Sequence, residues 1–418
     1  MTEQDLELKS IIRRLWWRMG FSTKVDVPLR ALVPSIRGQS RDGHETYTDL
    51  DVLGVWIGAD GRIQFSIADC KTSPRGSTER MFWIRGVAEL FDTSDAYMIR
   101  SVGPTAAARQ LAAKLRVGVL TPAELATLED YYPTPVDLSR DEISFLFNPV
   151  AIAGYRDAMT KIDKRLKPLR DYQECDFWVY EEHRNLFQMV AHLADSTKYL
   201  NPSNPAHRAL FYDSLWLYSL SVLRAAEHVR RTHLADIDTT LREYVFGGQL
   251  GLREKRRLAT VLRDSTNRKP TSPDHDVFPP YFSALLDLVT RFVRRPTVAT
   301  GVLRYAEWAS ELSLSKIDSP AAHVFGTRYN ELAGKLLTDV AGFLCGAARL
   351  DAGFRAEARR LFELGNKPLS KVQQRSICKD DNPGNEVVTQ SSIFDLKGDG
   401  LGETVTTFDV TGQDSSKA

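Results

Sequence analysis

The chain has 418 residues, of which 43% are hydrophobic and 26% are charged, a composition typical of a globular protein. Its 55 basic and 54 acidic residues leave a formal net charge of +1, so contact with phosphates has to come from a local basic patch. The length favours two domains, and the four scattered cysteines exclude a disulfide framework or a paired-cysteine zinc site.

The sequence contains no apolar stretch long enough to cross a bilayer, and its charged start is unlike a signal peptide. A cytoplasmic protein without a membrane partner is therefore expected.

An amphipathic helix is predicted over residues 5–19, because apolar side chains recur there at spacings of three and four. A strand is predicted over residues 25–33, and the polar, glycine-containing stretch 34–45 predicts a loop. Arg37 and Arg41 of that loop are candidates for contact with phosphates. The alternative is that they only keep the loop solvated.

A β-hairpin forms the centre of the predicted sheet. Residues 51–57 are apolar after their opening acid, residues 58–61 carry the turn chemistry, and residues 63–68 form a second apolar, β-prone run. The hairpin therefore places the start of its first strand beside the end of its second.

Charged residues stand at that end of the hairpin. Asp51 opens the first strand, and Asp69, Cys70 and Lys71 end the second. Because side chains alternate along a strand, Asp69 and Lys71 leave one face and Cys70 the other. Two carboxylates and the carbonyl of Cys70 suit Mg²⁺, and a lysine beside the ion can orient water and stabilise charge on a phosphate. Asp49 points the same way as Asp51 and is a possible substitute for it.

Alternating helices and strands complete this part of the chain. Periodicity and turn residues predict helices and strands in the order helix, three strands, helix, strand, helix, strand, which gives a mixed sheet with helices on both faces. The later predicted elements are a helix over 79–91, a strand over 96–101, a helix over 105–115, a strand over 117–120 and a helix from the TPAEL sequence at 121–125.

At Asp51 and at Asp69-Cys70-Lys71 the sequence resembles the PD-(D/E)xK nuclease superfamily. The closing strand–helix unit resembles its Mrr-like restriction endonuclease branch, and the resemblance covers residues 3–130. It implies a restriction-endonuclease-like α/β domain, a Mg²⁺ or Mn²⁺ cofactor and a DNA substrate. It also implies an acid on the first helix that completes the metal site, for which Glu7 is the candidate. The alternative for Glu7 is a solvated acid favoured by the helix dipole.

Beyond the proline-containing boundary at 131–135, strand signals nearly vanish. The predicted organisation is a nuclease-like domain over residues 1–132, an all-α domain over 133–365 that regulates or binds a partner subunit, and a polar tail or small β-appendage over 366–418. Eight helical runs are predicted in the all-α domain, at 181–200, 206–231, 236–246, 252–263, 281–293, 299–312, 321–350 and 354–364.

Basic residues gather in the helical region. Arg253, Arg256 and Arg257 are the strongest candidates for a phosphate-binding surface. The alternative is a solvated helix face paired with nearby glutamates.

The leading hypothesis is a metal-dependent endonuclease, acting on DNA, as a regulated effector in bacterial antiviral defence. A homodimer is an expectation of the same analogy, because nucleases that cut both strands commonly pair. The alternative is an idle nuclease-like scaffold or a nucleic-acid-binding subunit of a larger complex.

Overall fold

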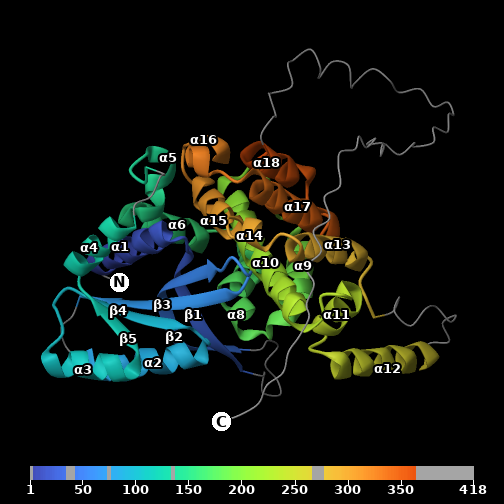
Figure 1. Ribbon diagram of the computed structural model, residues 1–418. Helices are drawn as coiled ribbons and strands as arrows, with labels where there is room; N and C mark the ends of the chain where they lie inside the picture. Colours follow the sequence, from blue (N-terminus) through green and yellow to red (C-terminus); the bar gives the residue numbers. More distant parts are fainter. Residues whose placement is uncertain (1–2, 34–42, 73–76, 133–136, 266–276, 364–418) are drawn as a thin grey trace, which may run out of the picture. The chain divides into compact units, whose positions relative to one another are not determined.

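The computed structural model describes residues 3–33, 43–72, 77–132, 137–265 and 277–363 (Figure 1). Its first part has the element order predicted from the sequence. The elements are α1 (Glu3–Met19), β1 (Ser22–Val33), β2 (Gly43–Ile57), β3 (Ile63–Lys71), α2 (Ser77–Leu90), β4 (Asp95–Arg100), α3 (Ala106–Leu115), β5 (Val117–Leu120) and α4 (Pro122–Tyr131).

The five strands form one mixed sheet in the order β1-β2-β3-β4-β5. The pairs β1–β2 and β2–β3 are antiparallel, and the pairs β3–β4 and β4–β5 are parallel. The parallel pairs are possible because α2 and α3 carry the chain back across the sheet. The predicted mixed sheet is therefore confirmed.

Helices cover both faces of the sheet (Figure 1). On one face, Ile12 and Trp16 of α1 pack with Val52 of β2, Cys70 of β3 and Leu125 of α4. The opposite face, which carries Leu53 and Ile67, belongs to a second and larger core that includes the α2 and α3 side chains. Neighbouring side chains along β2 and β3 alternate between the two cores, because both faces of the sheet are buried.

The strand β2 is longer than predicted. It begins at Gly43, so residues 43–45 belong to a strand and not to the expected polar loop, and residues 34–42 lie outside the described part of the chain. Asp51 consequently lies inside β2 and does not open it. The predicted hairpin strand was too short because polar residues before Asp51 hide the pattern of a half-buried strand.

The hairpin turn between β2 and β3 is held by a helix from the later part of the chain. Arg230 donates from Nη2 to the Gly61 carbonyl at 2.9 Å and from Nη1 to the Phe292 carbonyl at 3.4 Å. Gly61 has a φ of 77°, and a Cβ there would lie 2.1 Å from the Arg230 guanidinium. Only glycine satisfies both the left-handed backbone and the close approach.

The rest of the described chain is helical, as predicted. Its early elements are α5 (Asp141–Ser144), η1 (Phe145–Phe147), α6 (Pro149–Thr160), η2 (Lys164–Leu166), α7 (Lys167–Asp171), η3 (Tyr172–Asp176), α8 (Phe177–Val179), η4 (Glu182–Arg184) and α9 (Asn185–Ser196). They are followed by α10 (Pro205–Thr232), α11 (Ile237–Tyr244), α12 (Gln249–Ser265), α13 (Phe282–Val293), α14 (Pro296–Ala299), α15 (Val302–Leu312), α16 (Ala321–Phe325), η5 (Gly326–Arg328), α17 (Glu331–Ala347) and α18 (Ala352–Phe362).

The helical region contains more helices than the sequence predicts. The single helix expected over 321–350 is two helices, because Gly326 has a φ of 49° and Asn330 caps α17 by accepting from Ala333. The helix α6 was not predicted, although Asn148 caps it and a proline occupies its first turn.

By its contacts the chain divides into Met1–Asn366 and Lys367–Ala418. Within the first unit, Leu53 of the sheet shares one hydrophobic core with Trp216 and Trp308 of the helical region. The predicted boundary at 132/133 is not tested and stays a prediction, and the hairpin expected in the tail lies outside the described residues. No described helix has both the length and the apolar character that crossing a bilayer requires.

A buried charge network joins α1 and β1 to α15. Arg13 is 2% exposed, and its Nη2 lies 2.8 Å from Glu307 Oε1 and 2.5 Å from Glu311 Oε1. The second oxygen of Glu307 accepts from Ser22 Oγ at 2.7 Å and from the Thr23 amide at 2.8 Å. Burial alone would lower the pKa of Arg13, but the two carboxylates outweigh it and raise the pKa, so the guanidinium stays charged.

Replacing Arg13 with methionine should lower the free energy of unfolding by about 3–5 kcal/mol, because it leaves buried carboxylates uncompensated. The measurement is urea denaturation followed by circular dichroism. The control is Arg85→Met, which breaks an ion pair with the exposed Glu89 within α2 and should cost about 0.3–0.5 kcal/mol. A similar small loss for both variants would contradict this prediction.

Candidate metal and phosphate site

The candidate site lies where β2 and β3 part. Their ladder pairs Ile57 with Ile63 and continues to Val52 and Ala68. Beyond that pair, the Cys70 amide donates to the Asp51 side chain, with 2.8 Å between the amide nitrogen and Oδ2. A carboxylate thus takes the place of a main-chain acceptor and is fixed beside the strand that carries the Asp69-Cys70-Lys71 sequence.

Lys71 is the second predicted residue at this point. Its Nζ lies 3.9 Å from Asp51 Oδ2, and its side chain is 39% exposed. Burial raises the pKa of the Cys70 thiol well above its usual value, so the thiol stays protonated. Of the Cys70 groups, the backbone carbonyl is the one that suits a hard metal ion. The structure brings Asp51, Lys71 and the Cys70 backbone together.

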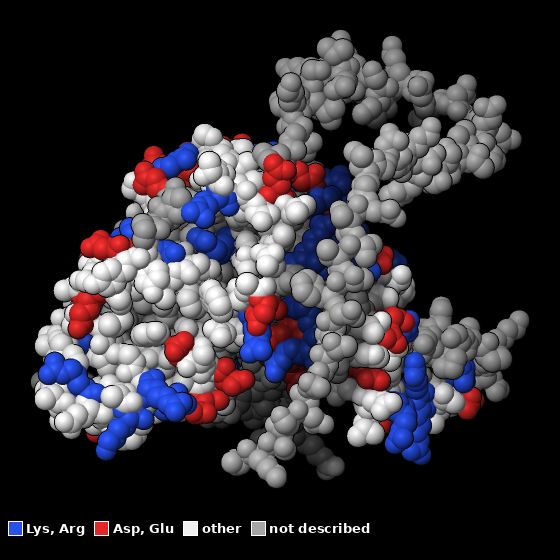
Figure 2. All heavy atoms as spheres, viewed as in Figure 1, with Lys and Arg blue, Asp and Glu red and all other residues white. Residues whose placement is uncertain are grey.

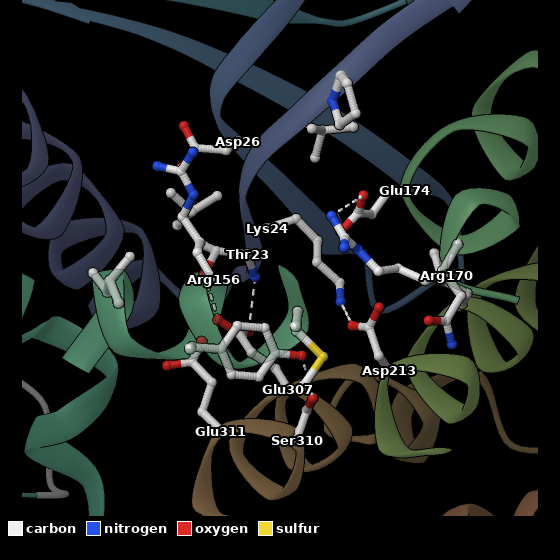
Figure 3. Close-up of a pocket in the computed structure, with 18 of the residues that line it drawn as sticks. Thr23, Lys24, Asp26, Arg156, Arg170, Glu174, Asp213, Glu307, Ser310 and Glu311 are labelled. Atoms are coloured by element: carbon white, nitrogen blue, oxygen red, sulfur yellow. Dashed lines mark hydrogen bonds and ion pairs between the residues drawn. The ribbon is translucent and has the colours of Figure 1, made fainter. Parts of the chain in front are cut away.

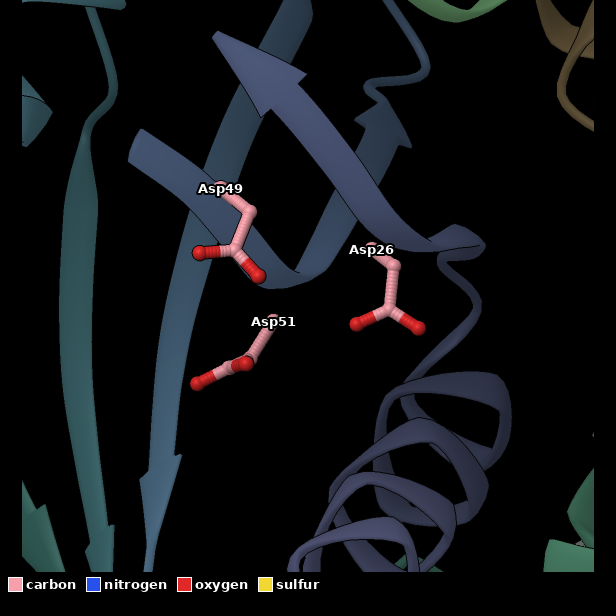
Figure 4. A group of neighbouring side chains, drawn as sticks. All are labelled: Asp26, Asp49 and Asp51. Atoms are coloured by element: carbon pink, nitrogen blue, oxygen red, sulfur yellow. The ribbon is translucent and has the colours of Figure 1, made fainter. Parts of the chain in front are cut away.

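Three carboxylates converge around Asp51 (Figure 4). One oxygen each from Asp26, Asp49 and Asp51 lies within 4.8 Å of the others, which is a spacing that can hold a metal ion. Asp26 reaches this position through a φ of 57°, unusual for a residue that is not glycine, between the ladder pairs Val25–Val52 and Val27–Leu50. The local backbone of β1 therefore contributes a ligand that strand periodicity does not reveal.

A buried lysine lies among these acids. Lys9 of α1 is 1% exposed, and its Nζ lies 2.6 Å from Asp51 Oδ1 and 2.5 Å from Asp26 Oδ1. Burial alone would lower the pKa of Lys9, but the attraction of Asp51 and Asp26 outweighs it and raises the pKa. A protonated ammonium thus bridges two of the three carboxylates and balances the charge of one.

Asp69 is 2% exposed and is held by arginines. Arg80 of α2 donates from Nη2 at 2.6 Å and from Nε at 3.1 Å, and Arg100 Nη2 lies 3.7 Å away. Asp69 is not one of the three clustered carboxylates, but it lines one narrow crevice together with Asp49 and Asp51, and this crevice is too tight to hold a water molecule. The three acids predicted on β2 and β3 thus line a common crevice, where Asp69 is paired with Arg80.

The acid of α1 that reaches this end of the sheet is Asp5. Its Oδ1 accepts from the Thr72 amide at 3.2 Å and from the Thr72 hydroxyl at 3.1 Å, directly after β3. Glu7, the residue named from the family resemblance, is exposed and forms no side-chain contact with another described residue. The contact of α1 with this end of the sheet is therefore made by Asp5, and the metal-binding role of Glu7 stays a prediction.

Lys9, Asp26, Arg80 and Arg100 were all missed by sequence reasoning. Only Lys9 left a signal, since a lysine one turn before Ile12 interrupts the buried stripe of an amphipathic helix. These partners are set by packing between distant elements, which residue spacing does not encode.

The predicted basic residues are distributed unevenly. Arg37 and Arg41 lie outside the described residues. Arg253 and Arg257 are exposed on α12, and Arg256 is half-buried on the same helix. Figure 2 shows basic side chains gathered over α12. The three arginines of α12 are not part of the Asp51 cluster.

Comparison of the chain with family models, with curated proteins and with solved structures finds no match. The fold and the site therefore define only a class of architecture. It is a mixed α/β sheet with clustered acids and a lysine where two central strands part, joined to a helical region.

If Lys9 occupies the position of a divalent cation, then Lys9→Met should gain a response to metal. The variant should lose about 3–5 kcal/mol of stability, because Asp26 and Asp51 lose their buried partner. Mn²⁺ should then raise its thermal midpoint more than that of the wild-type protein, because binding stabilises the folded state. Differential scanning calorimetry with and without Mn²⁺ measures both effects.

The double variant Lys9→Met/Asp51→Asn is the control. It removes the excess negative charge together with a ligand, so its thermal midpoint should be insensitive to Mn²⁺. Equal responses of all three proteins would show that Lys9 does not stand in for a cation.

Proposed function

We propose that the protein is a metal-dependent nuclease that hydrolyses phosphodiester bonds in DNA. The observation that carries this proposal is the contact between Asp51, the Cys70 amide and Lys71 where β2 and β3 part. Phosphodiester hydrolysis needs a charged, water-activating centre and a cation near the phosphate, and these residue types supply both.

The residues present fit a Mg²⁺ or Mn²⁺ ion. Asp51 and Asp49 would hold the ion with the Cys70 carbonyl, and Asp69 would join them from the same crevice by exchanging its pair with Arg80. When bound, the ion supplies a water of lowered pKa and positive charge beside the phosphate. Lys71 orients the attacking water and donates to the phosphate oxygen on which charge develops.

The fold supports the same conclusion. The order of elements is the one predicted from the sequence, and the sheet is mixed with helices on both faces, which supports the α/β domain that the resemblance to the PD-(D/E)xK nucleases implies. A nuclease joined to a helical region fits a regulated effector, and bacterial antiviral defence is the setting proposed by analogy. The helical region would hold the partner subunit or receive the trigger.

A second candidate is an idle nuclease-like scaffold. It is favoured by the ion pairs of the site, because Lys9 already pairs with Asp26 and Asp51, and Arg80 already pairs with Asp69. A protein that had lost catalysis would keep these pairs for stability alone.

Cleavage assays separate the two candidates. Supercoiled plasmid, single-stranded DNA and RNA are incubated with the protein in Mg²⁺ or Mn²⁺. Asp51→Asn, Asp69→Asn and Lys71→Met should each lower the rate of DNA cleavage on the order of 100-fold or more, as loss of a charge-stabilising group does. Asp60→Asn, in the exposed hairpin turn, is the matched control and should cleave like the wild type.

Retained cleavage in all three site variants would reject the assigned site. Binding of DNA without cleavage by the wild-type protein in either metal would favour the scaffold.

The basic helix α12 yields a separate prediction. If Arg257 contacts a DNA phosphate, Arg257→Gln should make the plot of log affinity against log salt less steep by about 0.9, the value for one contact. Fluorescence anisotropy with a DNA duplex over a salt series measures this slope. Arg328→Gln, which removes an exposed arginine from a different element, should leave the slope unchanged. Equal slopes for both variants and the wild type would remove α12 from the DNA interface.

A further inference from the structure

A cavity of about 350 Å³ lies between the sheet and the helical region (Figure 3). Its walls come from α1, β1 and β2 on one side and from α6, α7, η3, α8, α10 and α15 on the other. The volume lies at the lower end of the range of about 300–1,000 Å³ that is usual for small-molecule sites. None of the residues assigned to catalysis above except Asp49 lines it.

The basic groups in the cavity wall already have carboxylate partners. Lys24 pairs with Asp213, and the other pairs are Arg156 Nη1 with Asp26 Oδ2 at 3.0 Å and Arg170 Nε with Glu174 Oε1 at 2.7 Å. The remaining basic group, Arg13, is held by Glu307 and Glu311. An anionic ligand would therefore have to displace an internal carboxylate from its partner.

The acids in the wall outnumber the bases. Four basic and six acidic side chains line the cavity, and the carboxylates stay in excess when Lys9, which pairs with Asp26 from outside the lining, is counted as a fifth base. Asp49 is exposed and forms no ion pair with another described residue, and Glu311 uses only its Oε1 for Arg13. The excess negative charge favours a ligand that carries positive charge.

An amide in the wall adds a free acceptor. Gln173 is 3% exposed, and its Nε2 donates to the Leu210 carbonyl at 2.9 Å and to Ser214 Oγ at 2.5 Å. No described residue donates to its Oε1. The Oε1 atom is not fully buried, so an N–H group of a ligand in the cavity would have an acceptor in reach.

Aromatic side chains complete the lining. Tyr155 and Trp178 both line the cavity, and the Tyr155 hydroxyl lies 2.8 Å from Ser310 Oγ. Burial raises the pKa of Tyr155, so it stays a neutral phenol. Aromatic rings attract amines and guanidinium groups through their negative faces.

We propose that this cavity binds a small organic cation, an alkylamine or a guanidinium compound, through its excess carboxylates, the Gln173 carbonyl and its aromatic walls. The ligand would touch β1, β2 and three long helices at once, and so would stabilise the contact between the sheet and the helical region. This inference does not depend on the proposed nuclease activity.

The test is isothermal titration of the full-length protein, free of metal and DNA, at physiological ionic strength. The probes are putrescine, spermidine, agmatine and arginine, with butanediol as the neutral and succinate as the anionic counterpart. At least one amine or guanidine should bind saturably with one ligand per chain, and neither butanediol nor succinate should bind.

Glu311→Gln and Asp49→Asn keep the side-chain shapes and should each weaken binding about tenfold or more, the cost of losing a charged hydrogen bond. Glu142→Gln is the matched control, because its ion pair with Arg140 lies outside the cavity, and its affinity should equal that of the wild type. Circular dichroism verifies that each variant is folded, and the exposed Asp49 provides a test if Glu311→Gln does not fold. Absence of saturable binding by every cationic probe, tighter binding of succinate, or equal losses in all three variants would overturn the proposal.

Discussion

A buried ammonium is tolerated in a protein interior only when anions surround it, and Lys9 meets this condition between Asp26 and Asp51. The three residues come from α1, β1 and β2, so this one interaction holds a helix against two strands. It also determines the charge that the crevice presents. With the ammonium in place, the clustered carboxylates stay close together despite their mutual repulsion.

The same helix connects the candidate site to the rest of the molecule. Asp5, Lys9 and Arg13 are spaced four residues apart and lie on one face of α1. They contact in turn the end of β3, the carboxylate cluster and the acids of α15. Asp26 provides a second connection, since one oxygen pairs with Lys9 and the other with Arg156 in the cavity wall. A change in the helical region thus has a short physical route to the crevice.

The sequence predicts elements whose pattern is local and fails where the determining contact is remote. The hairpin, the order of helices and strands and the position of Asp51 beside Cys70 follow from turn residues and strand alternation. Asp26 was missed because alternation around it predicts an ordinary solvent-facing residue, while a left-handed backbone turns it inward. Arg80 was missed because its partner is set by how α2 lies on the sheet. Asp5 and Glu7 are two positions apart, roughly 200° around the helix, so the acid that contacts the end of β3 lies on the face opposite to Glu7.

The Arg230 clamp on Gly61 has a consequence for how the strands meet. Tips of hairpins usually tolerate inserted residues, because nothing distant depends on them. Here the hydrogen bond from Arg230 fastens the tip to α10, so the length of the turn determines the register of β2 against β3. Lengthening the turn would shift β2 against β3, and a shift of one residue would move every side chain of the shifted strand to the other face of the sheet. The position of Asp51 beside Lys71 at the other end of the two strands therefore depends on Gly61, a residue that takes no part in the chemistry of the site.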